Sequence, residues 1–174
     1  MGVIYPGTFD PVTLGHLDII RRARDIFGEV QVAIVASTPK SAFFPLTERM
    51  SLLREALLES RLDGVSVGSF DCLLVDYMRS IGATVFIRGL RANSDFEFEF
   101  QMQLVNRRLA PEITGIYMMP SENMIYISST LVREVAMYGG DLSTFVTPGV
   151  QKALQERFSA RYGTTSTSER NGQS

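Results

Sequence analysis

The chain has 174 residues, a formal net charge of -2 at neutral pH, 45% hydrophobic residues and 21% charged residues. This length and composition are typical of one soluble globular domain with a substantial core, and they exclude an intrinsically disordered protein. The slight acidic excess argues against a nucleic-acid-binding protein. Cys72 is the only cysteine, which fits a reducing compartment. Because no apolar run could cross a bilayer and no leader pattern is present, we expect a cytoplasmic protein without membrane contact.

Apolar, β-branched runs alternate with helical patterns along the chain. The expected strands cover residues 3–5, 30–36, 65–68, 84–87 and 114–119, and the expected helices cover 13–27, 47–60, 73–81, 95–109 and 131–138. This alternation predicts an α/β fold with a single doubly wound, Rossmann-like parallel sheet of five strands, helices on both faces and a helical C-terminal end.

Local signals mark several helix ends. Gly28 is a C-cap candidate, Ser94 with Glu97 forms a candidate capping box, and Thr147 with Pro148 reads as the N-cap and first residue of a terminal helix. The polar stretch 163–174 has no periodicity. We therefore expect one domain over residues 1–162 and a disordered tail over 163–174.

The loop between the first strand and the first helix has the features of an anion site. Helix N-terminal amides lack intrahelical partners and the helix dipole favours anions there, while Gly7 and Gly15 allow backbone to approach a ligand closely. His16, the only histidine, lies on the first helical turn. From the glycines and the histidine alone, an ordinary strand–turn–helix connection with a surface histidine remains the alternative.

Other notable residues also follow strand ends. Residues 37–40 follow the second expected strand, Arg88 follows the fourth, and residues 119–130 follow the fifth. In open α/β sheets, ligands bind outside the carboxyl ends of the strands where strand order reverses. Four loops are therefore expected to meet in one crevice.

The segment Thr13-Leu-Gly-His16 resembles the T/H-x-G-H motif of the nucleotidyltransferase superfamily, and the longer stretch 5–16 is similar to that of bacterial phosphopantetheine adenylyltransferases. Segments 37–40, 87–99 and 127–132 match the same family in order and spacing, so that the resemblance covers about residues 2–160. It implies reversible transfer of the adenylyl group of ATP to 4'-phosphopantetheine, which gives dephospho-coenzyme A and pyrophosphate, a late step of coenzyme A biosynthesis.

The resemblance also implies site residues. The expected catalytic residues are His16, Lys40, Arg88 and Arg91. The expected ATP-binding residues are Thr8, Phe9, His16, Gly89, Leu90, Arg91, Glu99, Met124, Ile125, Tyr126, Ile127, Ser128, Ser129 and Thr130. The expected acceptor-binding residues are Thr8, Lys40, Leu74 and Arg88. The family often has Ser at the position of Thr130 and Met at that of Leu74.

Structural alternatives accompany these assignments. Ser128, Ser129 and Thr130 would serve as an ordinary N-cap, which needs only one hydroxyl. Arg91 would form ion pairs with the acids of segment 95–99, an alternative that we expect to apply much less to Arg88. Thr13 is expected to cap the first helix rather than bind ligand.

The implied reaction fits what the chain contains. A substrate phosphate is already an anion, so no general base is required, and positioned donors for the phosphates suffice. Mg²⁺ is expected to arrive on ATP, because no His, Cys or carboxylate cluster has metal-site spacing. The resemblance further implies a homohexamer and binding of dephospho-coenzyme A or coenzyme A as product or feedback ligand.

Two other readings remain open. The first is a related nucleotidyltransferase that acts on nicotinate mononucleotide or glycerol phosphate, although such relatives usually have His where Thr13 stands. The second is a nucleotide-sensing domain without catalysis, against which the presence of His16 and the arginines argues. The length excludes a class I aminoacyl-tRNA synthetase, and the lack of a G-x-x-x-x-G-K-[ST] motif excludes a P-loop kinase.

Overall fold

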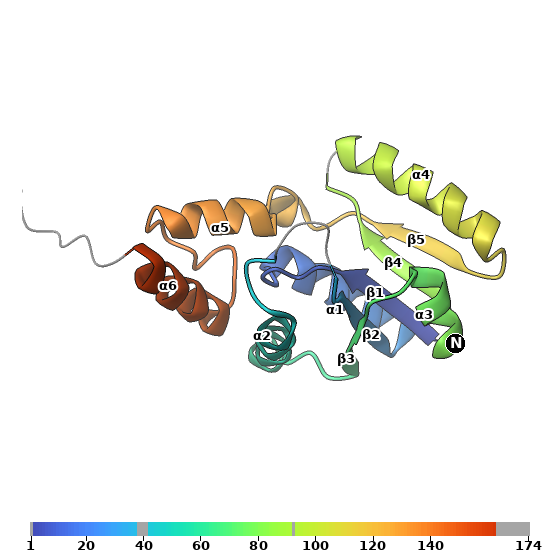
Figure 1. Ribbon diagram of the computed structural model, residues 1–174, viewed down its shortest axis with the longest axis horizontal. Helices are drawn as coiled ribbons and strands as arrows, with labels where there is room; N and C mark the ends of the chain where they lie inside the picture. Colours follow the sequence, from blue (N-terminus) through green and yellow to red (C-terminus); the bar gives the residue numbers. More distant parts are fainter. Residues whose placement is uncertain (1, 38–41, 92, 163–174) are drawn as a thin grey trace, which may run out of the picture.

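The computed structural model describes residues 2–37, 42–91 and 93–162 (Figure 1). The elements, in chain order, are β1 (Gly2–Gly7), α1 (Leu14–Phe27), β2 (Val30–Val35), α2 (Leu46–Glu59), β3 (Val65–Phe70), α3 (Leu74–Ser80), β4 (Ala83–Gly89), α4 (Asn93–Leu109), β5 (Thr114–Met118), the 3-10 helix η1 (Glu122–Met124), α5 (Ser129–Met137) and α6 (Pro148–Tyr162). The expected tail over 163–174 lies outside the described residues.

The five strands form one parallel sheet in the order β3-β2-β1-β4-β5. From β1, the chain first builds outward through β2 and β3 and then returns to the other side of β1 to add β4 and β5. Strand order therefore reverses between β1 and β4, which is where ligands bind in such sheets. The predicted α/β fold is confirmed.

Helices cover both faces of the sheet. Alternate side chains of a strand point to opposite faces. Val3 and Tyr5 of β1 accordingly join the larger core cluster, which contains residues of α1, α2, α5 and α6. Ile4 joins the smaller cluster with residues of α3 and with Ala110, just after α4. In Figure 1, α5 and α6 lie together at the left, while α3 and α4 lie at the right.

The helix ends agree with most of the predicted caps. Gly28 has φ 82° and its N–H donates to the Arg24 carbonyl at 2.7 Å. Thr147 holds the position before Pro148, where α6 begins, but its buried Oγ1 has no hydrogen-bond partner among the described residues. The predicted capping box of Ser94 with Glu97 is wrong, because the chain is already helical at Asn93. Other predicted ends differ from the observed ones by one to two residues; β3 and β4 extend past the apolar pattern, whereas β2 and α3 are shorter than predicted.

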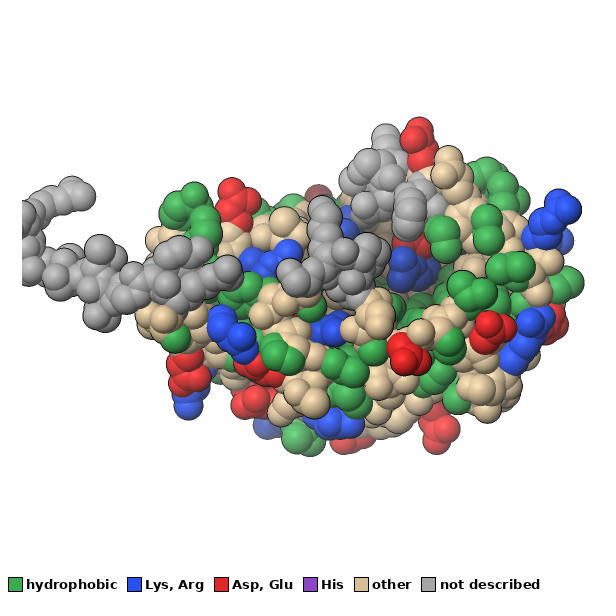
Figure 2. Space-filling model, in the orientation of Figure 1, with side chains coloured by type: hydrophobic (Ala, Val, Ile, Leu, Met, Phe, Trp, Pro, Cys, Tyr) green, Lys and Arg blue, Asp and Glu red, His purple; other side chains and the backbone are tan. Residues whose placement is uncertain are grey.

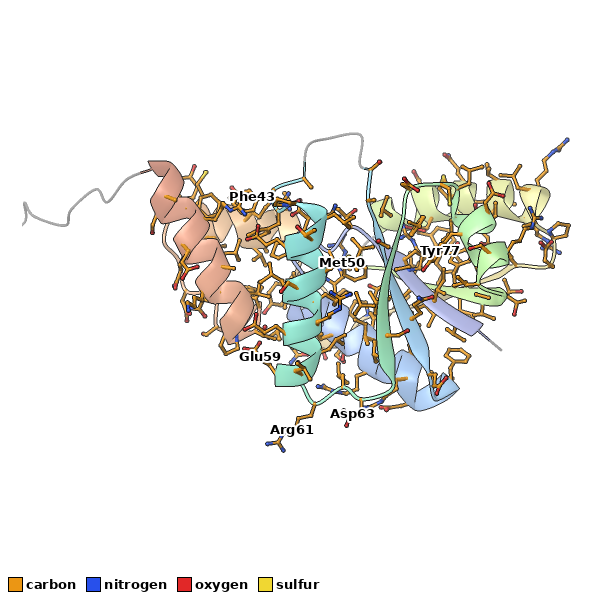
Figure 3. All side chains as sticks on the ribbon, turned by 60° about the horizontal axis from the view of Figure 1, so that its bottom comes forward. Phe43, Met50, Glu59, Arg61, Asp63 and Tyr77 are labelled. Carbon is orange, nitrogen blue, oxygen red and sulfur yellow. The ribbon has the colours of Figure 1, made fainter. Side chains whose placement is uncertain are left out.

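Helix α2 packs against α6 (Figure 3). Near the start of α2, Phe43 stacks on Phe158 with ring centroids 4.9 Å apart, and at its other end Glu59 accepts a hydrogen bond from the Gly149 N–H at 3.0 Å. In the turn that follows α2, Arg61 is exposed and points away from the body of the protein in Figure 3.

The segment after β2 is tied to the loop after β1 by buried polar groups. The Asp10 carboxylate accepts hydrogen bonds from the N–H groups of Phe43 at 2.6 Å and Phe44 at 2.8 Å. Arg49, which is only 1% exposed, donates to four carbonyls. These carbonyls belong to Thr8 (2.8 Å), Val35 (2.9 Å), Ala36 (3.3 Å) and Phe44 (3.1 Å). Since buried carbonyls need partners, Arg49 stabilises the ends of both strands.

Helix α4 carries many exposed apolar side chains. Among the described side chains of this helix, those that are at least 40% exposed are Phe96, Phe100, Met102, Leu104, Val105 and Leu109. Figure 2 shows apolar side chains gathered at the upper right, where α4 lies in Figure 1. Within the described parts of the chain, no helix combines the length and apolar character needed to span a bilayer.

Candidate active site

A cavity of about 500 Å³ lies at the carboxyl ends of β1 and β4, at the reversal of strand order. Of the predicted site residues, its lining includes Thr8, Phe9, His16, Arg88, Gly89, Arg91, Glu99, Ile127, Ser128, Ser129 and Thr130. Leu74, Leu90, Met124, Ile125 and Tyr126 do not line it, and Lys40 lies outside the described residues. The structure thus brings together residues from the loops after β1 and β4, from α4 and from the start of α5.

The imidazole of His16 is held by the N-cap residue of its own helix. The Thr13 N–H donates to Nδ1 of His16 at 3.1 Å, and the Thr13 Oγ1 lies 3.0 Å from the same atom. The His16 N–H in turn donates to Thr13 Oγ1 at 3.4 Å, which completes a reciprocal capping box. Because a backbone N–H can only donate, Nδ1 is the acceptor, and the proton of the neutral ring lies on Nε2.

His16 is neutral at physiological pH. Burial, with a further contribution from the positive charge of Arg91, lowers the pKa of His16 from 6.5 to about 4. The neutral ring keeps one donor, the Nε2–H, and its only acceptor atom is already occupied by Thr13. His16 is therefore equipped to donate a hydrogen bond to a phosphate and is not equipped to take up a proton from a nucleophile.

Two aromatic rings support His16. The Phe9 ring lies 5.0 Å from the imidazole, and the Tyr5 ring packs edge-on against Phe9 at 5.4 Å. Phe9 has φ 48°, a left-handed conformation uncommon outside glycine, and a Cβ at Gly7 would come within 2.9 Å of its ring. Burial raises the pKa of Tyr5 to about 12, which leaves a neutral hydroxyl in the lining.

Arg88 forms a close ion pair with Glu99. Its Nε lies 2.9 and 3.0 Å from the two carboxylate oxygens, its Nη2 lies 2.6 Å from Oε1, and its Nη1 donates to the Pro6 carbonyl at 2.9 Å. The expectation that Arg88 would pair little with the acids of segment 95–99 is wrong, whereas ion pairing of Arg91 with these acids stays a prediction. The physical reason is that α4 places Glu99 beside the end of β4.

The pair with Glu99 still leaves Arg88 donors for an anion. A guanidinium has five N–H groups, and the contacts with Glu99 and Pro6 engage three of them. Burial lowers the pKa of Arg88, but the hydrogen bonds and charge of Glu99 outweigh it and raise this pKa overall. Arg88 is consequently a permanently charged, oriented group at the cavity wall.

Arg91 connects the end of β4 to the segment before α5. Its Nη1 lies 3.4 Å from the Ile127 carbonyl, and its charge contributes to the low pKa of His16. Glu99 is the one carboxylate among the described residues of the lining, and it is paired with Arg88. The described walls therefore present a local excess of positive charge and donors, which suits a polyanionic ligand.

The three hydroxyl residues at the start of α5 all have structural partners. Ser128 is the N-cap and its Oγ accepts from the Leu131 N–H at 3.1 Å. Ser129 Oγ donates to the Pro11 carbonyl at 2.7 Å, and Thr130 Oγ1 lies 3.3 Å from Nη2 of Arg133. The capping alternative is thus realised for Ser128. Binding of phosphates by this helix start stays a prediction, to which the position of all three residues in the lining is favourable.

Comparisons with known proteins decide the family. Residues 4–135 match the cytidylyltransferase-like family. The chain is 48% identical over 159 residues to a phosphopantetheine adenylyltransferase of Hahella chejuensis. The aligned residues cover 91% of this chain and 98% of the relative. It is 51% identical over 155 residues to a phosphopantetheine adenylyltransferase of Methylococcus capsulatus, with 89% and 94% covered. The chain belongs to the phosphopantetheine adenylyltransferase family. The predicted family and enzyme class are confirmed.

Several contacts of this adenylyltransferase site escaped the sequence analysis. Tyr5 and Thr13 line the cavity, and the contact of Thr13 with His16 follows the i, i+3 spacing of a capping box, a signal present in the sequence. Outside the lining, Asp18 of α1 accepts hydrogen bonds from Ser121 in the segment after β5, and no signal in the sequence reveals this contact. In residues 2–37, 42–91 and 93–162, no group of three or more His, Cys, Asp or Glu residues could hold a metal ion.

Proposed function

We propose that this chain transfers the adenylyl group of ATP to 4'-phosphopantetheine, with release of pyrophosphate and reversible formation of dephospho-coenzyme A, a late step of coenzyme A biosynthesis. The observation that carries the proposal is the cavity at the β1–β4 reversal, in which His16, Arg88 and Arg91 lie together. The names of the two relatives support the choice of substrates.

The state of His16 supports a mechanism without a general base. The phosphate of the acceptor is an anion and attacks the α-phosphorus of ATP directly, in line with the departing pyrophosphate. His16, protonated at Nε2 and occupied at Nδ1, would donate to the α- or β-phosphate and stabilise the charge that develops there. The protein mainly holds two mutually repelling phosphate groups at reacting distance.

We assign the ATP phosphates to one side of the cavity. Arg91 and the hydroxyls and amides of Ser128, Ser129 and Thr130 would bind the triphosphate, since a helix N-terminus favours anions. The remaining proposed ATP contacts are those of Thr8, Phe9, Gly89, Leu90 and Glu99, with Met124, Ile125, Tyr126 and Ile127 at the adenine. Glu99 would contact ATP while it keeps its ion pair with Arg88.

We assign the acceptor phosphate to Arg88, through the N–H groups that Glu99 and Pro6 leave available. Thr8 would lie near the incoming phosphate, and Lys40 and Leu74 complete the proposed acceptor set. A half-buried guanidinium that can bind in bidentate fashion suits a phosphate dianion better than a solvated lysine alone would. Mg²⁺ would enter as part of the MgATP substrate.

We further propose a cytoplasmic homohexamer that also binds dephospho-coenzyme A or coenzyme A. The exposed apolar side chains of α4 support an assembly, because monomers rarely expose so many large apolar groups on one helix. Phe100, which is 52% exposed, lies among them. Sedimentation should show an assembly for the wild type and smaller species for Phe100→Asp. A wild type that sediments as a monomer would refute this part.

The activity is tested by incubating the protein with ATP, Mg²⁺ and a panel of phosphorylated acceptors, with pyrophosphate release as the readout. We expect release with 4'-phosphopantetheine and none with nicotinate mononucleotide or glycerol phosphate. His16→Ala should lose about a hundredfold or more in turnover while it remains folded. Preference for another acceptor would replace this proposal with a related nucleotidyltransferase activity.

A further inference from the structure

One face of α1 docks the segment that leads from β5 to α5. Gly15, Asp18 and Arg22 are three and four residues apart and therefore lie on the same side of the helix. All three contact residues 119–127: a Cβ at Gly15 would lie 3.4 Å from the Met124 carbonyl, and Arg22 donates to the Met119 carbonyl.

Asp18 makes the central contact of this face. Its carboxylate accepts two hydrogen bonds from Ser121, one from the backbone N–H at 2.8 Å and one from Oγ at 2.8 Å. Both bonds are charge-assisted, and both oxygens of the carboxylate are used, which fixes position as well as orientation. The two residues are separated by 103 positions in the chain, so this contact sets a tertiary relationship.

Backbone hydrogen bonds connect Ser121 to the part of the segment that lines the cavity. The Met124 N–H donates to the Ser121 carbonyl at 2.8 Å, and the Ile127 N–H donates to the Met124 carbonyl at 3.1 Å. Pro120 and Ile127 line the cavity at the two ends of the segment, whereas Asp18 does not line it. Asp18 can therefore influence a ligand through Ser121 but not by touching it.

We propose that Asp18 is a positioning residue for ATP, which sets the distance between His16 and the segment 120–127 by binding Ser121. The inference rests on the proposed function, in which His16 contacts the phosphates and this segment flanks the adenine. His16 and the segment 120–127 would then contact opposite ends of the same nucleotide, the phosphates and the adenine. Because His16 and Asp18 are two residues apart on one helix, α1 holds both ends of the nucleotide site in a fixed relation.

The effect should be specific to ATP. Asp18→Ala should raise KM for ATP about tenfold. Without the charge-assisted hydrogen bonds to Ser121, ATP would have to order the segment 120–127 when it binds, and this ordering would weaken its binding. KM for 4'-phosphopantetheine should stay within about twofold, because Thr8 and Arg88, two of the described residues assigned to the acceptor, form their hydrogen bonds with Arg49, Pro6 and Glu99 and not with this segment. Asp18→Asn retains one acceptor oxygen and should recover part of the ATP affinity.

Three comparisons separate positioning from general structural damage. Asp25→Ala removes an exposed carboxylate from the same helix and should leave both KM values unchanged. Ser121→Ala removes the Oγ bond but keeps the backbone N–H bond, so it should raise KM for ATP in the same direction but less than Asp18→Ala does, and the double variant should be no worse than Asp18→Ala alone. If Asp18→Ala fails to fold, Ser121→Ala still provides the comparison, because it only shortens a half-buried side chain.

Calorimetry of ATP binding to each variant, together with steady-state kinetics, decides the matter. Weakened ATP binding with an unchanged acceptor KM supports the inference. An unchanged ATP affinity in Asp18→Ala and Ser121→Ala, or equal losses for both substrates, would overturn it. Wild type that binds ATP but does not adenylylate 4'-phosphopantetheine would instead count against the proposed function, so the two failures are distinguishable.

Discussion

Thr13 and His16 are joined by reciprocal hydrogen bonds: the Thr13 N–H donates to Nδ1 of His16 at 3.1 Å, and the His16 N–H donates to Thr13 Oγ1 at 3.4 Å. The histidine is thereby part of its own helix cap. This arrangement fixes the ring orientation and the tautomer before any ligand binds. A donor that is oriented in advance costs little reorganisation during the reaction.

The first prediction concerns the ionisation of His16. In the protein without ligand, ¹⁵N chemical shifts of the single imidazole should show the Nε2–H tautomer and a pKa of about 4. Addition of ATP should raise this pKa, because nearby negative charge favours the protonated ring. An Nδ1–H tautomer, or a pKa close to 6.5 without ligand, would contradict the geometry described here.

The second prediction follows from the same pKa. Between about pH 6.5 and pH 4 the unfolded chain binds a proton at His16 that the folded chain does not bind. The free energy of unfolding therefore decreases progressively as the pH falls through this window, because protonation of His16 favours the unfolded chain. Urea unfolding should show that wild type loses more stability than His16→Asn between about pH 7 and pH 5. Equal pH dependence of the two proteins would show that His16 does not titrate in this way.

The third prediction concerns the buried Arg49. Arg49→Met should lower the free energy of unfolding by about 3 kcal/mol, because the carbonyls at the ends of β1 and β2 lose their donors. Arg54→Met, an exposed position on the same helix, is the matched control and should change stability by about 0.5 kcal/mol or less. Chemical denaturation measures both, and similar losses at the two positions would argue against the role of Arg49.

The architecture could be predicted because its signals are local. β-branched runs and helical periodicity alternate along the chain, and right-handed crossovers then leave few possible topologies. The N-cap of α1 at Thr13 and the C-cap at Gly28 also depend on neighbouring residues only. The capping box at Ser94 failed because a capping pattern does not say at which residue the helix begins.

Much of the site geometry depends on contacts between distant residues and could not be predicted. Arg49 belongs to an amphipathic helix, where a charged residue ordinarily faces solvent. It is nevertheless buried and donates hydrogen bonds to carbonyls of three other segments. The bond from Ser121 to Asp18 likewise depends on how the chain returns after β5. Family resemblance identified residues such as Arg88 but did not reveal the pairing with Glu99.

The fourth prediction tests the assignment of the two phosphate groups. Arg88→Lys keeps a charge beside Glu99 but loses the bidentate geometry, so it should weaken 4'-phosphopantetheine about tenfold and ATP much less. Ser129→Ala should do the reverse, because Ser129 belongs to the proposed triphosphate site. Calorimetric titration of both ligands against both variants gives the comparison. Equal losses for the two ligands in either variant would refute the partition.

The central claim is that a substrate phosphate attacks ATP without a general base, and the most direct measurement compares 4'-phosphopantetheine with pantetheine that lacks the phosphate. An alcohol near neutral pH needs a base, and the described cavity offers only a protonated Nε2 of His16 and a Glu99 held by Arg88. After a long incubation with ATP and Mg²⁺, mass spectrometry should detect dephospho-coenzyme A from the phosphorylated acceptor and no significant adenylylated pantetheine. Abundant adenylylated pantetheine would contradict the account, because it would require a base that the described part of this site does not contain.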